Sequence, residues 1–138
     1  MDTTPTSGQA LPAGTRLEEF VVERVLGSGG FGITYLARDT RLERRVVIKE
    51  NLPVFAFRDT ESSTVHPRST RGEDPELFRW SLESFVREAR TLAKFDHPNI
   101  VKIHRIFEEN GTAYFVMPHV EGESLDQMIK KRKEVGHP

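Results

Sequence analysis

The chain has 138 residues, of which 36% are hydrophobic and 30% charged, so it is long enough for one globular domain with a buried core. Twenty basic and 21 acidic side chains leave a net charge of −1, which argues against a nucleic-acid groove or a membrane-surface patch. The lack of cysteine excludes disulfides and thiolate metal sites, and the histidines show no metal-ligand spacing. The sequence has no run of 18 apolar residues that could span a membrane, and its N-terminus lacks the basic start and apolar core of a signal peptide. We therefore expect a cytoplasmic location, with no metal, nucleic acid or membrane bound by this chain.

The first part of the chain predicts a flexible segment followed by strands. Residues 1–16 are rich in Thr, Ser, Pro and Gly, a composition that disfavours folding. Residues 20–27, 32–38 and 44–50 are short runs of β-branched and aromatic residues separated by turns, which predicts an antiparallel meander. Residues 58–76 are polar and long for a connection, so we expect a functional or mobile loop with a small extra hairpin around Thr64 and Val65.

A helix is predicted to begin near Asp74. Asp74 is a good N-cap residue, and Pro75 suits the first helical position because its missing N–H costs nothing there. The pattern allows a break before Ser81 and an end before Pro98. Apolar residues then recur at steps of three and four, so one face of the helix should be buried: Leu82, Phe85, Val86, Ala89, Leu92 and Ala93.

The last part of the chain predicts two strands and a second helix. Asn110-Gly111 separates the runs 103–109 and 112–117, and this dipeptide favours a type I′ hairpin turn. Ser124 and Gln127 form a capping box for a short final helix. The predicted fold is therefore α+β, with a five-stranded antiparallel sheet, one main helix and a short C-terminal helix.

One motif has the form G-x-G-x-x-G: Gly27-Ser28-Gly29-Gly30-Phe31-Gly32. A dinucleotide-binding fold would need a helix after the loop, but residues 33–37 predict a strand, and a P-loop would need Lys and Ser or Thr after Gly32. The remaining alternatives are plain hairpin turns or a strand-loop-strand flap whose N–H groups approach phosphates, with Phe31 at its tip.

Lys49 and Glu88 are the charged residues that stand out. Strand alternation places Lys49 and Val47 on one face and Val46 and Ile48 on the other. Glu88 flanks the apolar stripe of the helix, and none of its neighbours at three and four residues carries a positive charge: Ser84, Phe85, Thr91 and Leu92. Lys49 and Glu88 are therefore each either exposed to solvent or paired with a residue from another part of the fold.

Together these features resemble the amino-terminal lobe of the protein kinase fold, and from about Leu17 onward they resemble bacterial serine/threonine protein kinases. LGSGGFGITYLA is similar to the phosphate-covering loop, VVIKE to the Val-Ala-Ile-Lys strand, and FVREARTLAKFDHPNIV to helix C with its His-Pro-Asn turn. The resemblance implies that Leu26, Thr34 and Val47 enclose the adenine of ATP, that Lys49 holds its α- and β-phosphates, and that Glu88 orients Lys49 in an ion pair.

The resemblance also places a gatekeeper and a hinge after the last strand. Met117 would be the gatekeeper, and Pro118-His119-Val120 the hinge that reads adenine through the Pro118 carbonyl and the Val120 N–H. Thr34 stands where the family usually has Val and Val47 where it usually has Ala. These two departures alter the polarity and volume of the expected adenine site.

The sequence contains no His-Arg-Asp with its Asn, no Asp-Phe-Gly and no Ala-Pro-Glu. His104-Arg105 continues into Ile106 within a predicted strand, and Phe95-Asp96-His97 is not an Asp-Phe-Gly motif. We expect residues 17–117 to be the ATP-binding small lobe and 118–138 the hinge and the start of the large lobe. The ligands of Mg²⁺ would belong to a catalytic lobe absent from this chain, which alone should be inactive and self-associate.

By resemblance, the parent enzyme would transfer the γ-phosphate of ATP to Ser or Thr of a protein substrate. A second hypothesis is a pseudokinase-like or stand-alone lobe that binds a partner through the surface a catalytic lobe would cover. A third, structural hypothesis treats the glycines as turns and Lys49 and Glu88 as solvated surface residues. A sequence continuing into His-Arg-Asp and Asp-Phe-Gly would favour the enzyme.

Overall fold

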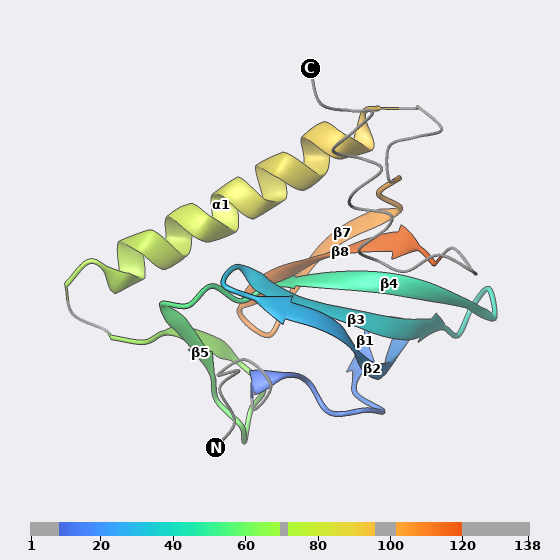
Figure 1. The fold of residues 1–138 in the computed structure, drawn as a ribbon, viewed down its shortest axis with the longest axis horizontal. Helices are drawn as coiled ribbons and strands as arrows, with labels where there is room; N and C mark the ends of the chain where they lie inside the picture. The colour runs from blue at the N-terminus through green and yellow to red at the C-terminus, as the bar shows by residue number, and fades with distance from the viewer. Residues whose placement is uncertain (1–8, 70–71, 96–101, 120–138) are drawn as a thin grey trace.

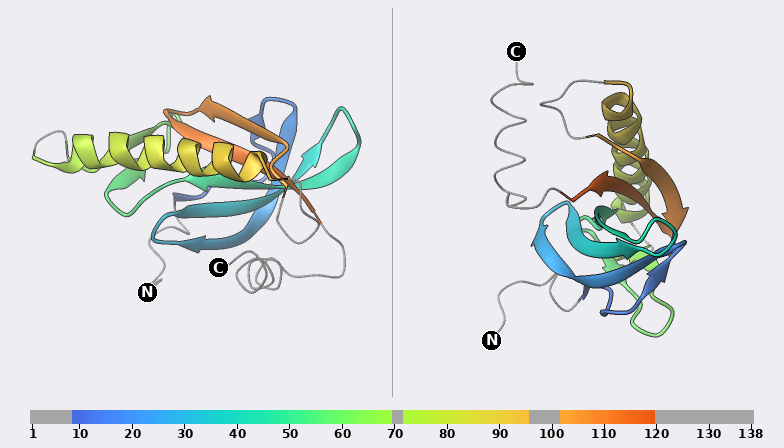
Figure 2. Two further views of the ribbon diagram at one scale, coloured as in Figure 1. Left: turned by 90° about the horizontal axis from the view of Figure 1, so that it is seen from above. Right: turned by 90° about the vertical axis from the view of Figure 1, so that its right-hand side faces the viewer.

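The computed structural model describes residues 9–69, 72–95 and 102–119. A six-stranded antiparallel sheet has the order β1-β2-β3-β4-β8-β7, and a separate two-stranded sheet pairs β5 with β6 (Figure 1). The bounds of the strands are β1 Arg16–Leu17, β2 Phe20–Gly29, β3 Gly32–Asp39, β4 Arg44–Asn51, β5 Ala56–Arg58, β6 Val65–Pro67, β7 Arg105–Glu109 and β8 Thr112–Pro118. The single described helix, α1 (Asp74–Ala93), lies alongside the sheet (Figure 2).

The α+β class and the antiparallel meander are confirmed, but the number of strands was wrong. The sheet has six strands rather than five because the two-residue strand β1 pairs with the start of β2, Leu17 opposite Phe20. Glu18, in the tight turn between them, has a positive φ of 53°. So short a strand has no alternation pattern of its own, and only its partner reveals it. The predicted C-terminal helix from Ser124 lies outside the described residues.

Residues 9–15 pack against the sheet, unlike the flexible segment expected there. Leu11 is only 3% exposed and belongs to the main core, and its N–H donates to the Tyr35 hydroxyl at 3.0 Å. Gly14 N–H donates to the Val22 carbonyl at 2.7 Å. One buried leucine with these bonds fixes a segment whose composition alone predicts no order.

The small hairpin expected around Thr64 and Val65 is present. β5 and β6 pair with Phe57 opposite His66, and Val65 lies in the second strand rather than at the turn. The hairpin contacts the β7–β8 turn, where the Val65 N–H donates to the Asn110 carbonyl at 2.8 Å. The chain order therefore places this insertion between β4 and α1, against the end of the main sheet.

Helix α1 is continuous through Ser81, so the predicted break is absent. Glu73 rather than Asp74 is the N-cap residue, Pro75 lies in the first turn, and the helix ends at Ala93. Ala89 and Phe78 are buried, whereas Ala93, expected on the buried face, is exposed in the last turn. Among the described residues, no helix is long and apolar enough to span a membrane.

The two faces of the sheet bury two separate apolar clusters. Val46 and Ile48 belong to the larger cluster, together with Leu11, Tyr35 and Phe78, whereas Val47 faces a smaller cluster beside α1. The predicted alternation along β4 is therefore confirmed. Phe85 of the helix stacks on Phe115 of β8, with ring centroids 5.0 Å apart, and this contact docks α1 on the face that carries Lys49.

The Asn110-Gly111 turn has the positive φ values expected, 55° and 72°, so we predict that Gly111→Ala destabilises the fold. Gly72 has a similar φ of 75°, but a Cβ there would meet nothing within 4 Å, whereas one on Gly111 would lie 3.0 Å from the Val65 carbonyl oxygen. Gly72→Ala should cost about 1–2 kcal/mol from backbone strain alone. Gly111→Ala should cost about 1–3 kcal/mol more from the clash, measured by urea unfolding. Equal losses would contradict this account of the turn.

Candidate nucleotide-binding site

The glycine-rich segment forms the predicted strand-loop-strand flap. β2 ends at Gly29 and β3 begins at Gly32, and these two residues pair across the hairpin, with Gly30 and Phe31 at the tip. The Phe31 side chain is 81% exposed. A strand rather than a helix follows the loop, which agrees with the exclusion of the dinucleotide-binding and P-loop alternatives.

The glycines of the loop serve different purposes. A Cβ on Gly32 would lie 2.1 Å from the Glu50 carbonyl oxygen, so close packing of β3 against β4 requires glycine there. A Cβ on Gly27 or Gly29 would meet nothing within 4 Å, and neither residue is among those with positive φ. Packing and backbone conformation therefore leave both positions open, and this open space fits close approach of a phosphate to the backbone.

Lys49 lies in one row with the loop and the central strands. Gly27 pairs with Thr34, Thr34 with Lys49, and Lys49 with Phe115. With neighbouring strands about 4.8 Å apart, the row brings Lys49 within about 10 Å of the loop backbone. Lys49 is partly buried, and its Nζ lies 5.9 Å from the centroid of the Phe115 ring.

Helix α1 carries Glu88 in its second half, on the exposed side of the helix. Phe115, which the sequence did not single out, lies between this helix and Lys49: its ring stacks on Phe85 and also faces the Lys49 ammonium group. Ion pairs among the described residues include those of Arg45 with Glu23, Arg58 with Glu50, and Arg105 with Glu18 and Glu19. The Lys49–Glu88 pair stays a prediction.

The residues expected around adenine lie along the same face. Val47 and Met117 are opposite each other in β4 and β8, both are buried, and Leu26 packs against their cluster. Pro118 ends β8, paired with Val46. Val120, expected to donate to adenine, lies outside the described residues, as do His97 and the rest of the His-Pro-Asn turn.

A pocket of about 590 Å³ opens beside Pro118, the first residue of the predicted hinge. Pro118 and His119 line it together with charged side chains: Glu23, Arg38, Glu43, Arg44 and Arg45. Alternation places Arg45 on the Val47 face of β4, so the pocket continues the face of the predicted adenine site toward the β3–β4 turn. Its lining is far more polar than an adenine site needs, so the predicted adenine site stays at the apolar positions Leu26, Val47 and Met117.

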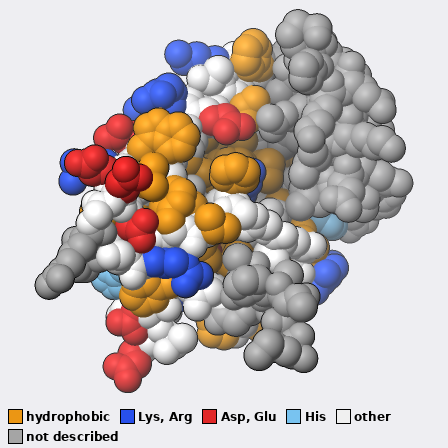
Figure 3. Space-filling model, turned by 60° about the vertical axis from the view of Figure 1, so that its left-hand side comes forward, with side chains coloured by type: hydrophobic (Ala, Val, Ile, Leu, Met, Phe, Trp, Pro, Cys, Tyr) orange, Lys and Arg blue, Asp and Glu red, His pale blue; other side chains and the backbone are white. Residues whose placement is uncertain are grey.

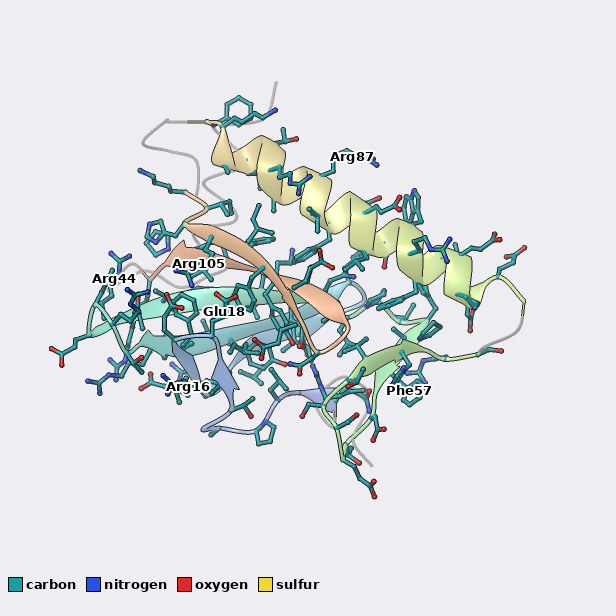
Figure 4. All side chains as sticks on the ribbon, turned by 180° about the vertical axis from the view of Figure 1, so that it is seen from behind. Arg16, Glu18, Arg44, Phe57, Arg87 and Arg105 are labelled. Atoms are coloured by element: carbon teal, nitrogen blue, oxygen red, sulfur yellow. The ribbon has the colours of Figure 1, made fainter. Side chains whose placement is uncertain are left out.

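The electrostatics of the site come from Lys49 and from backbone N–H groups. Within the three described ranges, no group of three or more His, Cys, Asp or Glu side chains gathers where a metal ion would bind. Figure 4 labels the ion-paired residues Glu18, beside β1, and Arg105, at the start of β7, and shows Arg87 on the helix.

This arrangement, an antiparallel sheet with a glycine loop at one end, a lysine on the facing strand and one helix alongside, is that of a kinase-type small lobe. Residues 20–137 match the family model described as the protein kinase domain, and the chain therefore belongs to the protein kinase family.

The relatives it matches are bacterial serine/threonine protein kinases. The chain is 32% identical over 114 residues to serine/threonine-protein kinase PknD of Chlamydia pneumoniae, covering 83% of this chain and 10% of that protein. It is 36% identical over 110 residues to serine/threonine-protein kinase PrkC of Bacillus subtilis, covering 80% of this chain and 14% of that protein. The chain thus spans a small fraction of the length of both relatives.

The fold of this chain is also similar to a solved structure. The structure described as PpkA-294 apo form is 38% identical, with a TM-score of 0.78, and the match covers 91% of this chain and 44% of that one. The predicted resemblance to the small lobe of bacterial serine/threonine protein kinases is confirmed by these three similarities.

We predict that Gly29→Ala and Gly32→Ala separate ligand binding from folding. Gly29→Ala should change the free energy of unfolding by less than about 0.5 kcal/mol, because a methyl group there meets open space. It should weaken ATP binding, because that space is where the phosphates would lie. Gly32→Ala should cost about 3 kcal/mol or more through the clash with the β4 backbone. Urea unfolding and ATP titration of the protein with its catalytic lobe measure both effects, and unchanged ATP affinity in Gly29→Ala would contradict the assignment.

Proposed function

We propose that this chain is the ATP-binding small lobe of a serine/threonine protein kinase that transfers the γ-phosphate of ATP to a protein hydroxyl. The observation that carries the proposal is the row from Gly27 through Thr34 to Lys49, with open space at Gly27 and Gly29. This row brings the Lys49 ammonium group near the backbone of the glycine loop, and ammonium groups and backbone N–H groups are the groups that bind a polyphosphate.

The residues of this lobe would bind and orient the nucleotide. The loop backbone would donate N–H groups to the phosphates, and Lys49 would neutralise charge on the α- and β-phosphates. Val47, Met117 and Leu26 would enclose adenine with apolar surface, and main-chain groups of Pro118 and Val120 would read its edge. Thr34 adds a hydroxyl next to Lys49, on the row that leads to the loop.

The remaining chemistry would come from a catalytic lobe. Phosphoryl transfer needs a residue that accepts the proton of the substrate hydroxyl and carboxylate or amide oxygens that hold Mg²⁺. The motifs that supply them in this family do not occur in these 138 residues. We therefore propose that this lobe forms one wall of the nucleotide cleft. A catalytic lobe would form the opposite wall and bind the protein substrate.

We predict that Lys49→Met lowers kcat/KM by about 100-fold or more in the protein with its catalytic lobe, because the charge that positions the phosphates is lost. Lys94→Met, an exposed residue that caps the end of α1, is the matched control and should leave the rate unchanged. Steady-state kinetics and ATP titration measure the difference.

We predict that Glu88→Gln lowers turnover more than it lowers stability, because the proposed role of Glu88 is to orient Lys49. Glu83→Gln, an exposed residue on the same helix, is its control and should behave as wild type. If Lys49→Met and Glu88→Gln both leave turnover and ATP affinity unchanged, the site assignment is wrong and a partner-binding lobe becomes the better account.

A further inference from the structure

The segment Leu52–Val54, here called the bridge segment, is hydrogen-bonded to the tip of the glycine loop. The Leu52 N–H donates to the Phe31 carbonyl at 3.2 Å, and the Val54 N–H donates to the Gly30 carbonyl at 3.1 Å. Cγ1 of Val54 lies 3.7 Å from the place a Cβ on Gly30 would take. Because these bonds join the tip itself, the position of the bridge segment sets the position of the loop.

The hairpin β5–β6 holds the bridge segment from its other side. Arg68, directly after β6, donates its Nε–H to the Val54 carbonyl at 2.6 Å, and its backbone N–H to the Phe55 carbonyl at 2.8 Å. Val54 is therefore bonded through its N–H to the loop and through its carbonyl to the hairpin. Its side chain is 62% exposed, so these backbone bonds rather than burial fix its place.

The hairpin is in turn fixed to the sheet by a buried charge cluster around Glu50, the residue after Lys49. The Glu50 side chain is fully buried, and its carboxylate accepts hydrogen bonds from Arg58 of β5 and from the hydroxyls of Tyr35 and Tyr114. Arg58 also donates to the carbonyls of Gln9, at 2.7 Å, and Ser63, at 2.8 Å. The cluster thus joins β3, β4, β8, the hairpin and the N-terminal segment.

The polar side chains of this cluster fix the relative positions of the segments that carry them, in addition to any contribution to the free energy of unfolding. Burial raises the pKa of Tyr35 and of Tyr114, and the Glu50 carboxylate raises both further, so both hydroxyls stay protonated donors at neutral pH. A buried ion pair often stabilises no more than apolar residues of the same volume, but its hydrogen bonds allow one arrangement. That arrangement orients the bridge segment, which follows β4 and is hydrogen-bonded to the glycine loop.

We propose that Glu50, Arg58 and Arg68 are positioning residues for the glycine-rich loop, and that the hairpin β5–β6 is a built-in brace that holds the loop over the nucleotide. The proposal rests on the proposed function in one respect, that the loop binds ATP. Figure 1 shows the chain leaving β4 beside the β2–β3 turn before it enters β5. These residues act on the loop through backbone bonds and do not themselves touch the nucleotide.

The first test removes Arg68, which is exposed, so that the fold is retained. In the protein with its catalytic lobe, Arg68→Ala should raise the KM for ATP about tenfold and change kcat less than about twofold. It should also speed hydrogen exchange at the Leu52 and Val54 amides, which make the two bonds to the loop. Arg41→Ala, an exposed arginine in the turn at the opposite end of β3, is the control and should change neither quantity.

The second test addresses the buried cluster. Arg58→Met should have the same two effects, whereas Leu17→Ala, a core substitution in β1 outside the cluster, should destabilise the fold without a selective effect on those amides or on KM. If exchange at Leu52 and Val54 is unchanged in Arg68→Ala, or if it rises while the KM for ATP stays at the wild-type value, this inference is wrong. Failure of the wild-type protein to bind ATP would instead overturn the proposed function, and the exchange result would still decide whether Arg68 holds the loop.

Discussion

The carboxylate of Glu50 is the constraint on which this fold depends. An ionised group taken fully out of water is tolerated only when donors replace its hydration, and here three donors do so. They come from β3, β8 and β5, segments that are far apart in the sequence. None of these segments can shift alone without leaving part of the carboxylate unsatisfied, so the sheet and the inserted hairpin form one cooperative unit.

The two faces of the sheet differ in the side chains they carry and in the segments that cover them. The face with Glu50 is closed by the N-terminal segment, the hairpin and the start of α1, and carries the larger apolar cluster. The other face holds Lys49, Val47 and Met117, with a smaller cluster against the second half of α1. The left-hand side of Figure 1, brought forward in Figure 3, shows apolar side chains gathered among charged ones. The two faces of the sheet therefore carry separate clusters, with Glu50 on one and Lys49 on the other.

Sequence patterns predicted the features that depend on neighbouring residues. Alternation identified the faces of β4, the Asn-Gly dipeptide identified a hairpin turn, and residue spacing identified α1 and the glycine flap. The missed features need partners distant in the chain: β1 exists only against β2, and Leu11 is ordered only because Tyr35 and the core receive it. Glu50 did carry a signal, since alternation from Val46 and Ile48 points it into the core, but nothing local identifies Arg58 as its partner. Within the candidate site, the facing of Lys49 and Val47 was predictable, whereas the place of Phe115 required the register of β4 on β8.

The pleat of β4 has a further consequence. Lys49 and Glu50 are adjacent, yet Lys49 is half-buried on the face toward α1 and Glu50 is fully buried on the other face, because successive residues of a strand point to opposite faces. A slip by one residue would exchange them, driving an ammonium group into the core and expelling the carboxylate that organises it. The Glu50 cluster therefore fixes the register of β4: a one-residue slip is penalised by an unpaired buried charge, so a chain in the native register has Lys49 on the face opposite Glu50. The interaction that stabilises the native register of β4 is thus also the one that fixes the face on which Lys49 lies.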